Sequence, residues 1–63
     1  MCESTVLLKE DSGLRSVMVD AVKVAIDDRG CVCIDPLGRS LPLDGTHVVE
    51  IDLRRHRIIL ERA

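Results

Sequence analysis

The sequence predicts an all-β fold built from six or seven short antiparallel strands. Two observations carry this prediction. Valine and isoleucine are dense along the whole chain, and turn residues interrupt the apolar runs about every 8–12 residues. The run VMVDAVKVAI could be placed on a helix, but the flanking turn signals favour strands.

The expected strands are residues 4–9, 14–20 continuing through 21–27, 31–35, 39–43, 46–53 and 57–61. The stretch DDRG predicts a turn in which Gly30 takes a positive φ. The pair Asp44-Gly45 predicts a hairpin between its flanking strands. Pro42 cannot donate a ladder hydrogen bond, so we expect it on an edge strand or at a bulge.

Alternation along two of these strands predicts which side chains face the core. Successive side chains of a strand point to opposite faces, so residues two apart share a face. Two apolar sets follow from this rule, and they comprise Val49, Ile51 and Leu53 in one strand and Val22, Val24 and Ile26 in another. Each set is expected to pack on the core.

The length allows a single domain, residues 1–63, with a small core. The chain has no aromatic residue, so the packing must be aliphatic. Short strands in a chain of this size predict a small SH3-like, half-closed barrel. Its unpaired edges and any leftover apolar face would be covered by a second copy, which predicts a homodimer.

Composition also limits the class of protein. No stretch reaches the ~20 apolar residues of a membrane helix, and no basic-then-apolar signal segment is present. Three cysteines are an odd number, which argues against a secreted disulfide framework. We therefore expect a cytoplasmic protein with no membrane role. No nucleophile beside a base and no glycine-rich phosphate loop occurs, so we do not expect an enzyme.

Cys31 and Cys33 are two residues apart, which places both sulfurs on one face of a strand. No second cysteine pair or histidine pair completes a four-ligand metal motif. We expect both thiols, or one of them, to be buried beside isoleucine and valine side chains, and a redox or metal role is the alternative.

Arg54, Arg55, His56 and Arg57 form a basic cluster, called here the basic turn, that is expected at a solvated hairpin tip. Its arginines could contact phosphate. The net charge of −2 and the lack of any aromatic residue to stack on a base argue against nucleic acid. His56 and His47 have no local partner that would indicate a metal site.

Cys2 is a candidate metal ligand. When an initiator methionine is removed ahead of a small residue, Cys2 offers an amine and a thiol that close a chelate ring on one ion. Deprotonation of the Glu3 backbone amide would add a third donor, and such a set suits square-planar Ni(II) or Cu(II). A two-fold axis near the chain start would bring two Cys2 thiolates together. An incidental, frayed thiol is the alternative.

The opening MCESTV, together with Glu50–Leu53 and His56–Glu61, resembles the CooT family of small nickel-binding accessory proteins. The resemblance spans essentially the whole chain. It implies a homodimeric SH3-like barrel in which the cysteine after the initiator methionine, here Cys2, binds Ni(II).

The resemblance implies a metallochaperone that assists nickel insertion into the Ni–Fe–S active site of carbon monoxide dehydrogenase. Its partners would be a second copy of the chain and that enzyme or its nickel-insertion machinery. Two alternatives stay open. One is a small RNA-binding module that uses the basic turn, and the other is a chaperone whose Cys2 contacts a partner's metal precursor, as in hydrogenase maturation.

Overall fold

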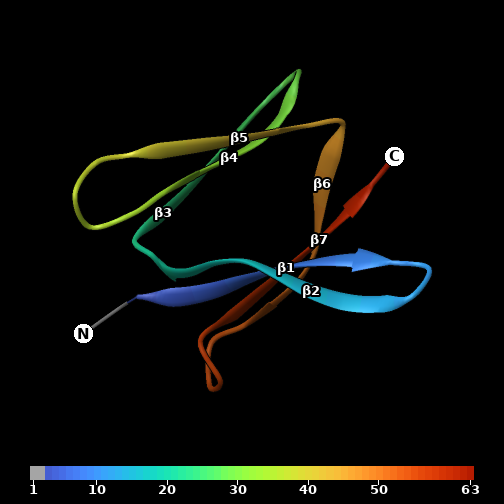
Figure 1. Cartoon of the computed structure of the whole chain (residues 1–63), viewed down its shortest axis with the longest axis horizontal. Coiled ribbons are helices and arrows are strands. Elements are labelled where there is room, and N and C mark those ends of the chain that lie inside the picture. Colours follow the sequence, from blue (N-terminus) through green and yellow to red (C-terminus); the bar gives the residue numbers. More distant parts are fainter. Residues whose placement is uncertain (1–2) are drawn as a thin grey trace.

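The structure, a computed structural model, describes residues 3–63, which form seven β-strands and no helix. The all-β prediction is therefore confirmed. Figure 1 shows the two groups of strands and their connections. The strands are β1 (Ser4–Glu10), β2 (Gly13–Ala21), β3 (Lys23–Asp27), β4 (Gly30–Ile34), β5 (Ser40–Asp44), β6 (Thr46–Asp52) and β7 (Arg57–Arg62).

The first sheet has four strands in the order β2-β1-β7-β6. Two antiparallel hairpins, β1–β2 and β6–β7, are joined by the parallel pairing of β1 with β7. The expectation that all strands are antiparallel is wrong at this junction. Parallel neighbours need a long crossover connection. Here the chain from β2 through β6 connects β1 to β7.

The second sheet is a meander in the order β3-β4-β5. The β3–β4 turn follows the prediction, since Gly30 has a φ of 143°. A Cβ at this position would lie 2.6 Å from the Leu43 carbonyl oxygen, so glycine also permits close approach of the backbone. Pro42 lies on β5, which is an edge strand as predicted, and it pairs with Val32 of β4.

The chain leaves one sheet for the other at two points that the sequence did not indicate. The expected run 14–27 is interrupted at Val22, whose N–H donates to the Ile34 carbonyl at 2.8 Å. The hairpin predicted at Asp44-Gly45 is wrong, because β5 and β6 belong to different sheets. Gly45 has a φ of 76° and turns the chain through a corner, which its N–H holds by donating to the Arg29 carbonyl.

The core lies between the two sheets and is aliphatic apart from two cysteines. Its fully buried members are Val6, Leu8, Ala21, Cys31, Cys33 and Leu60. β4 supplies both cysteines and packs against β6 and β2. A small set of partly buried side chains surrounds this cluster, and it includes Val17, Met18, Val24, Leu41, Leu43, Val48 and Ile58.

The two predicted apolar faces do not cover the core as expected. On β6, a bulge between Val48 and Glu50 shifts the alternation, so Val48 packs on the core while Val49, Ile51 and Leu53 are exposed. In the other set, Val24 packs on the core, whereas Val22 and Ile26 are exposed. Much apolar surface therefore remains uncovered in one chain.

Candidate functional site

The predicted metal ligands lie at the start of β1. Cys2 is outside the described residues. Glu3 is half-buried and immediately precedes Ser4, the first residue of β1.

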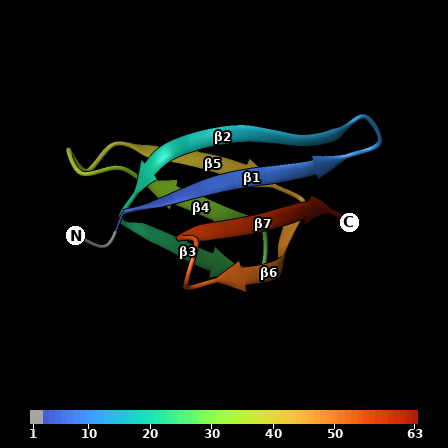
Figure 2. The ribbon, with the colours of Figure 1, turned by 90° about the horizontal axis from the view of Figure 1, so that it is seen from below.

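β1 is an inner strand, and its start is held on both sides. Ser4 pairs with Ala21 at the end of β2. On the other side, the Thr5 N–H donates to the His56 carbonyl at 2.9 Å. Figure 2 shows the start of β1 and the β6–β7 turn at the same end of the molecule, with the C-terminus at the other end. We call this the β1-start end.

Arg54, Arg55 and His56 of the basic turn close the β6–β7 hairpin and are exposed, as predicted for a solvated tip, whereas Arg57 begins β7 and is half-buried. Asp52 organises it: its Oδ1 accepts from the backbone N–H of Arg54 at 3.1 Å and of Arg55 at 3.0 Å. The other carboxylate oxygen lies 3.7 Å from Nη1 of Arg55. Backbone hydrogen bonding from Arg55 is the main cause that lowers the pKa of Asp52 below its ordinary value.

Two residues of this turn are unusual. His56 has a φ of 55°, a left-handed conformation that is uncommon outside glycine. The Nε atom of Arg57 is buried and has no hydrogen-bond partner among residues 3–63. Buried polar atoms are normally paired. The turn therefore carries local strain and an unused donor beside the start of β1.

Cys31 and Cys33 are free thiols, 1% and 0% exposed, as the sequence led us to expect. Cys31 Sγ lies 3.8 Å from the Thr46 carbonyl oxygen and donates to it. Burial, and secondarily the neighbouring Cys31, raise the pKa of the Cys33 thiol. Both thiols are inaccessible to a metal ion in the folded chain because they are buried, and the raised pKa of Cys33 further disfavours its thiolate.

The structure does not bring the two histidines together. His47 lies near the start of β6, and its Nε2 is 3.9 Å from a Glu61 carboxylate oxygen. His56 lies at the opposite end of the same hairpin. Within residues 3–63, no three histidine, cysteine or acidic side chains gather closely enough to hold a metal ion.

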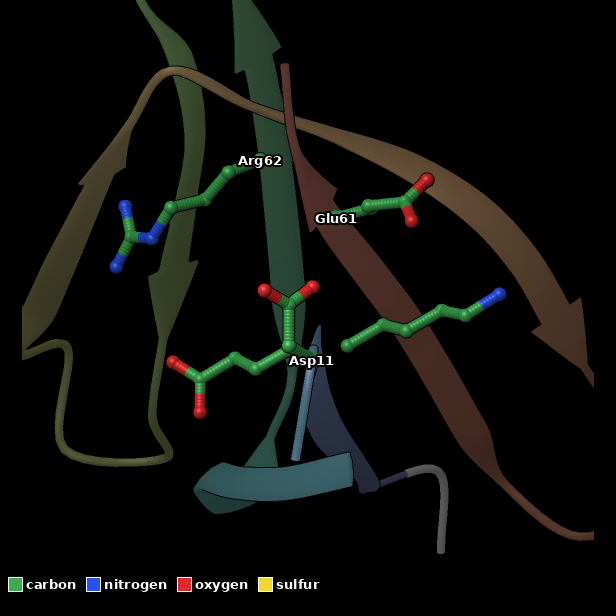
Figure 3. A pocket seen from close by; sticks show the side chains of 5 residues that line it. Asp11, Glu61 and Arg62 are labelled. Atoms are coloured by element: carbon green, nitrogen blue, oxygen red, sulfur yellow. The ribbon is translucent and has the colours of Figure 1, made fainter. Parts of the chain in front are cut away.

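Two shallow hollows lie at the end of the molecule remote from the start of β1. One, of about 360 Å³, is lined by charged residues of β1, its following turn and β7, as Figure 3 shows. The other, of about 430 Å³, adds apolar residues of β2, β6 and β7. Arg15 pairs with Glu10 at 3.1 Å beside them. Neither hollow includes a residue predicted to bind metal.

Sequence reasoning missed that the basic turn adjoins the start of β1. This contact depends on the parallel pairing of β1 with β7, for which no local pattern exists. The conformation of the turn did have a sequence signal. An aspartate at the start of a turn, here Asp52, commonly accepts hydrogen bonds from the backbone N–H groups that follow it.

These features describe a small β-protein whose most distinctive surface is a charged turn beside the chain start. Residues 1–61 match the family described as CooT, CO dehydrogenase accessory protein CooT, and the chain belongs to this family. A comparison with curated proteins finds no match. Within residues 3–63 no helix is long and apolar enough to span a membrane.

The fold is also similar to that of a crystal structure assigned to CooT from Carboxydothermus hydrogenoformans. The TM-score is 0.86 at 19% identity, and the alignment covers 98% of each chain. At this identity the similarity establishes the fold and nothing further.

Proposed function

We propose that this chain is a cytoplasmic Ni(II) metallochaperone that assists nickel insertion into the Ni–Fe–S active site of carbon monoxide dehydrogenase. In this proposal residues 1–63 form one domain, and nickel is cargo held by the Cys2 thiolates of two chains. The Cys2 amine and the Glu3 backbone nitrogen complete the donor set. The observation that carries the proposal is the family match, which includes residues 2 and 3.

The surroundings of Glu3 support a ligand at this position. β1 is held by β2 and β7, so residues from Ser4 onward belong to a rigid inner strand. The Glu3 backbone nitrogen, one residue ahead of this strand, has a short tether and a restricted range. A restricted range lowers the entropy cost of assembling a chelate.

The exposed apolar side chains support a dimer. Large exposed hydrophobic side chains include Val22, Ile51 and Leu53. Val22 follows β2 and Leu53 precedes the basic turn, so both belong to segments at the β1-start end. A two-fold interface at this end would cover apolar surface and bring the two chain starts together. The two sheets would then act as the halves of a half-closed, SH3-like barrel.

Ligation by thiolate and amine predicts a strong pH dependence. Protons compete for both donors, so the affinity for Ni(II) should fall as the pH drops below the thiol range. Donor type alone does not select nickel, because Cu(II) binds such sites more tightly. Selectivity would come from metal supply and from the partner.

The first test is a Ni(II) titration of untagged protein whose mass establishes whether Met1 is present. We expect sulfur-to-nickel charge-transfer absorption that saturates near one Ni(II) per two chains. The Cys2→Ser variant should lose it, and the Cys31→Ser/Cys33→Ser variant should keep it.

Absorption that survives in Cys2→Ser but disappears in the double variant would overturn the assignment of the ligand. Absence of nickel binding in every variant would overturn the metallochaperone proposal. Circular dichroism of each variant separates a lost ligand from a lost fold.

A further inference from the structure

The basic turn is positioned to meet whatever protein receives a ligand from the chain start. The Thr5 N–H donates to the His56 carbonyl at 2.9 Å, so the turn lies directly beside the start of β1. A partner surface that approaches the start of β1 closely enough to exchange a metal ion there must also approach this turn. The inference drawn here rests on the proposed function.

The positive charge of this turn is largely uncompensated. Three of the nine Lys and Arg residues of the chain lie within the four positions 54–57. Within residues 3–63, the acidic side chain that lies within ion-pair distance of the turn is Asp52, whose Oδ2 is 3.7 Å from Nη1 of Arg55. Its Oδ1 already accepts from two backbone N–H groups. Among the described residues, Arg54 has no ion pair and is exposed, whereas Arg57 is half-buried and its charge acts on Asp52 without a direct ion pair. The Arg57 Nε has no acceptor among these residues.

Metal exchange between two anionic donor sets explains why a positive rim is useful. Thiolate and deprotonated amide donors leave a Ni(II) site with little or no net positive charge. A receiving site must also offer anionic donors such as thiolates or carboxylates. Two such sites repel each other as they meet, and guanidinium groups beside them offset that repulsion and speed the encounter.

We propose that the basic turn is the docking surface for an acidic protein surface that surrounds the receiving nickel site. An RNA partner fits less well, since the chain carries a net charge of −2 and no aromatic residue for base stacking. In a dimer with its axis near the chain start, two basic turns flank the shared site and double the charge available to the partner.

The first arm of the test uses metal-free protein. Amide chemical shifts are followed while a glutamate-rich peptide is added at low salt, and then while a uridine oligonucleotide of equal charge is added. We expect shifts concentrated at residues 3–5 and 53–57 with the peptide, and their loss at high salt. Tighter binding of the oligonucleotide, or shifts elsewhere on the molecule, would overturn the proposal.

The second arm measures nickel transfer. Nickel-loaded protein is mixed with acceptor peptides that share one Ni(II)-binding sequence and differ only in a glutamate or lysine tail. We expect the glutamate-tailed acceptor to remove nickel about tenfold faster at low salt. That preference should disappear in Arg54→Glu/Arg55→Glu and shrink in the milder Arg54→Gln/Arg55→Gln.

The matched control is Arg29→Glu/Arg62→Glu, which changes the net charge equally at the opposite end of the molecule. The Arg29 carbonyl and the residue after Arg62 both bond to Gly45, which places them there. Equal loss of preference in this control would show a net-charge effect and overturn the docking surface. Nickel binding by wild-type protein without any acceptor preference would also overturn it, while leaving the proposed function intact.

Discussion

Single aspartates define several turns of this protein. Oδ1 of Asp27 accepts from the N–H groups of Arg29 and Gly30. Asp52 repeats this pattern in the basic turn. Asp35 does so between β4 and β5, where its Oδ1 accepts from Leu37 and Arg39. Each carboxylate satisfies backbone donors that a tight turn leaves without partners.

Asp52→Asn tests this role in the basic turn. Asparagine can still accept from the two N–H groups but loses its charge and the contact with Arg55. Because the folded pKa of Asp52 is lowered, its stabilisation is complete above the unfolded pKa and is lost as the pH falls through the folded value. We therefore expect wild-type Tm to exceed that of the variant at neutral pH, and the gap to close below about pH 4.

The control is Asp11→Asn, an exposed turn carboxylate that accepts no hydrogen bond from residues 3–63. Its Tm should track wild type across the same pH series. A gap for Asp52→Asn that persists unchanged into strong acid would show that the charge of Asp52 contributes nothing to the turn.

At the scale of elements, β4 is the strand on which the second sheet depends. It is the middle strand, and it carries both core cysteines. The sequence predicted this strand well, because its alternation and the glycine turn before it are local signals. It could not predict the bulge on β6 or the corner at Gly45, since both depend on contacts between strands distant in sequence.

Burial in β4 predicts slow thiol chemistry. In a Cys2→Ser background, Cys31 and Cys33 should react with a thiol reagent only as fast as the protein opens, because burial raises the pKa of Cys33 and excludes the reagent. Labelling is followed by mass spectrometry with and without denaturant. An added Ser12→Cys, in the exposed β1–β2 turn, should react at once. Equally rapid labelling of all three sites would contradict the described core.

For the whole molecule, the proposed dimer makes a prediction about location. Val22→Asn/Leu53→Asn removes apolar side chains at the β1-start end and should shift sedimentation from dimer toward monomer. Burial of one such side chain in the interface contributes about 1.5–3 kcal/mol to the stability of the dimer. Each substitution is present in both chains of a two-fold dimer, so its effect counts twice.

The control Leu14→Asn/Ile26→Asn removes comparable surface elsewhere, since Leu14 and Val22 are each 50% exposed. It should leave the dimer intact. Dissociation by the control alone would move the interface away from the chain start and remove the basis for a shared site. A monomeric wild-type protein would contradict the dimer itself.

The candidate site shows where sequence reasoning stops. Cys2 and Glu3 stood out from residue chemistry and the family resemblance, and the buried state of Cys31 and Cys33 followed from alternation. The nearness of the basic turn to the chain start did not follow, because β1 and β7 pair across nearly the whole chain. Pairing between the first and last strands is a global property that no short pattern records.

That same pairing makes the first strand dependent on the last. Until β7 has been synthesised and docked, β1 has only β2 as a neighbour and remains an edge. Contacts of such large sequence separation form late in folding. The start of β1 would therefore acquire its fixed surroundings only after synthesis is nearly complete, so a nascent or truncated chain would lack the surroundings of the proposed metal site.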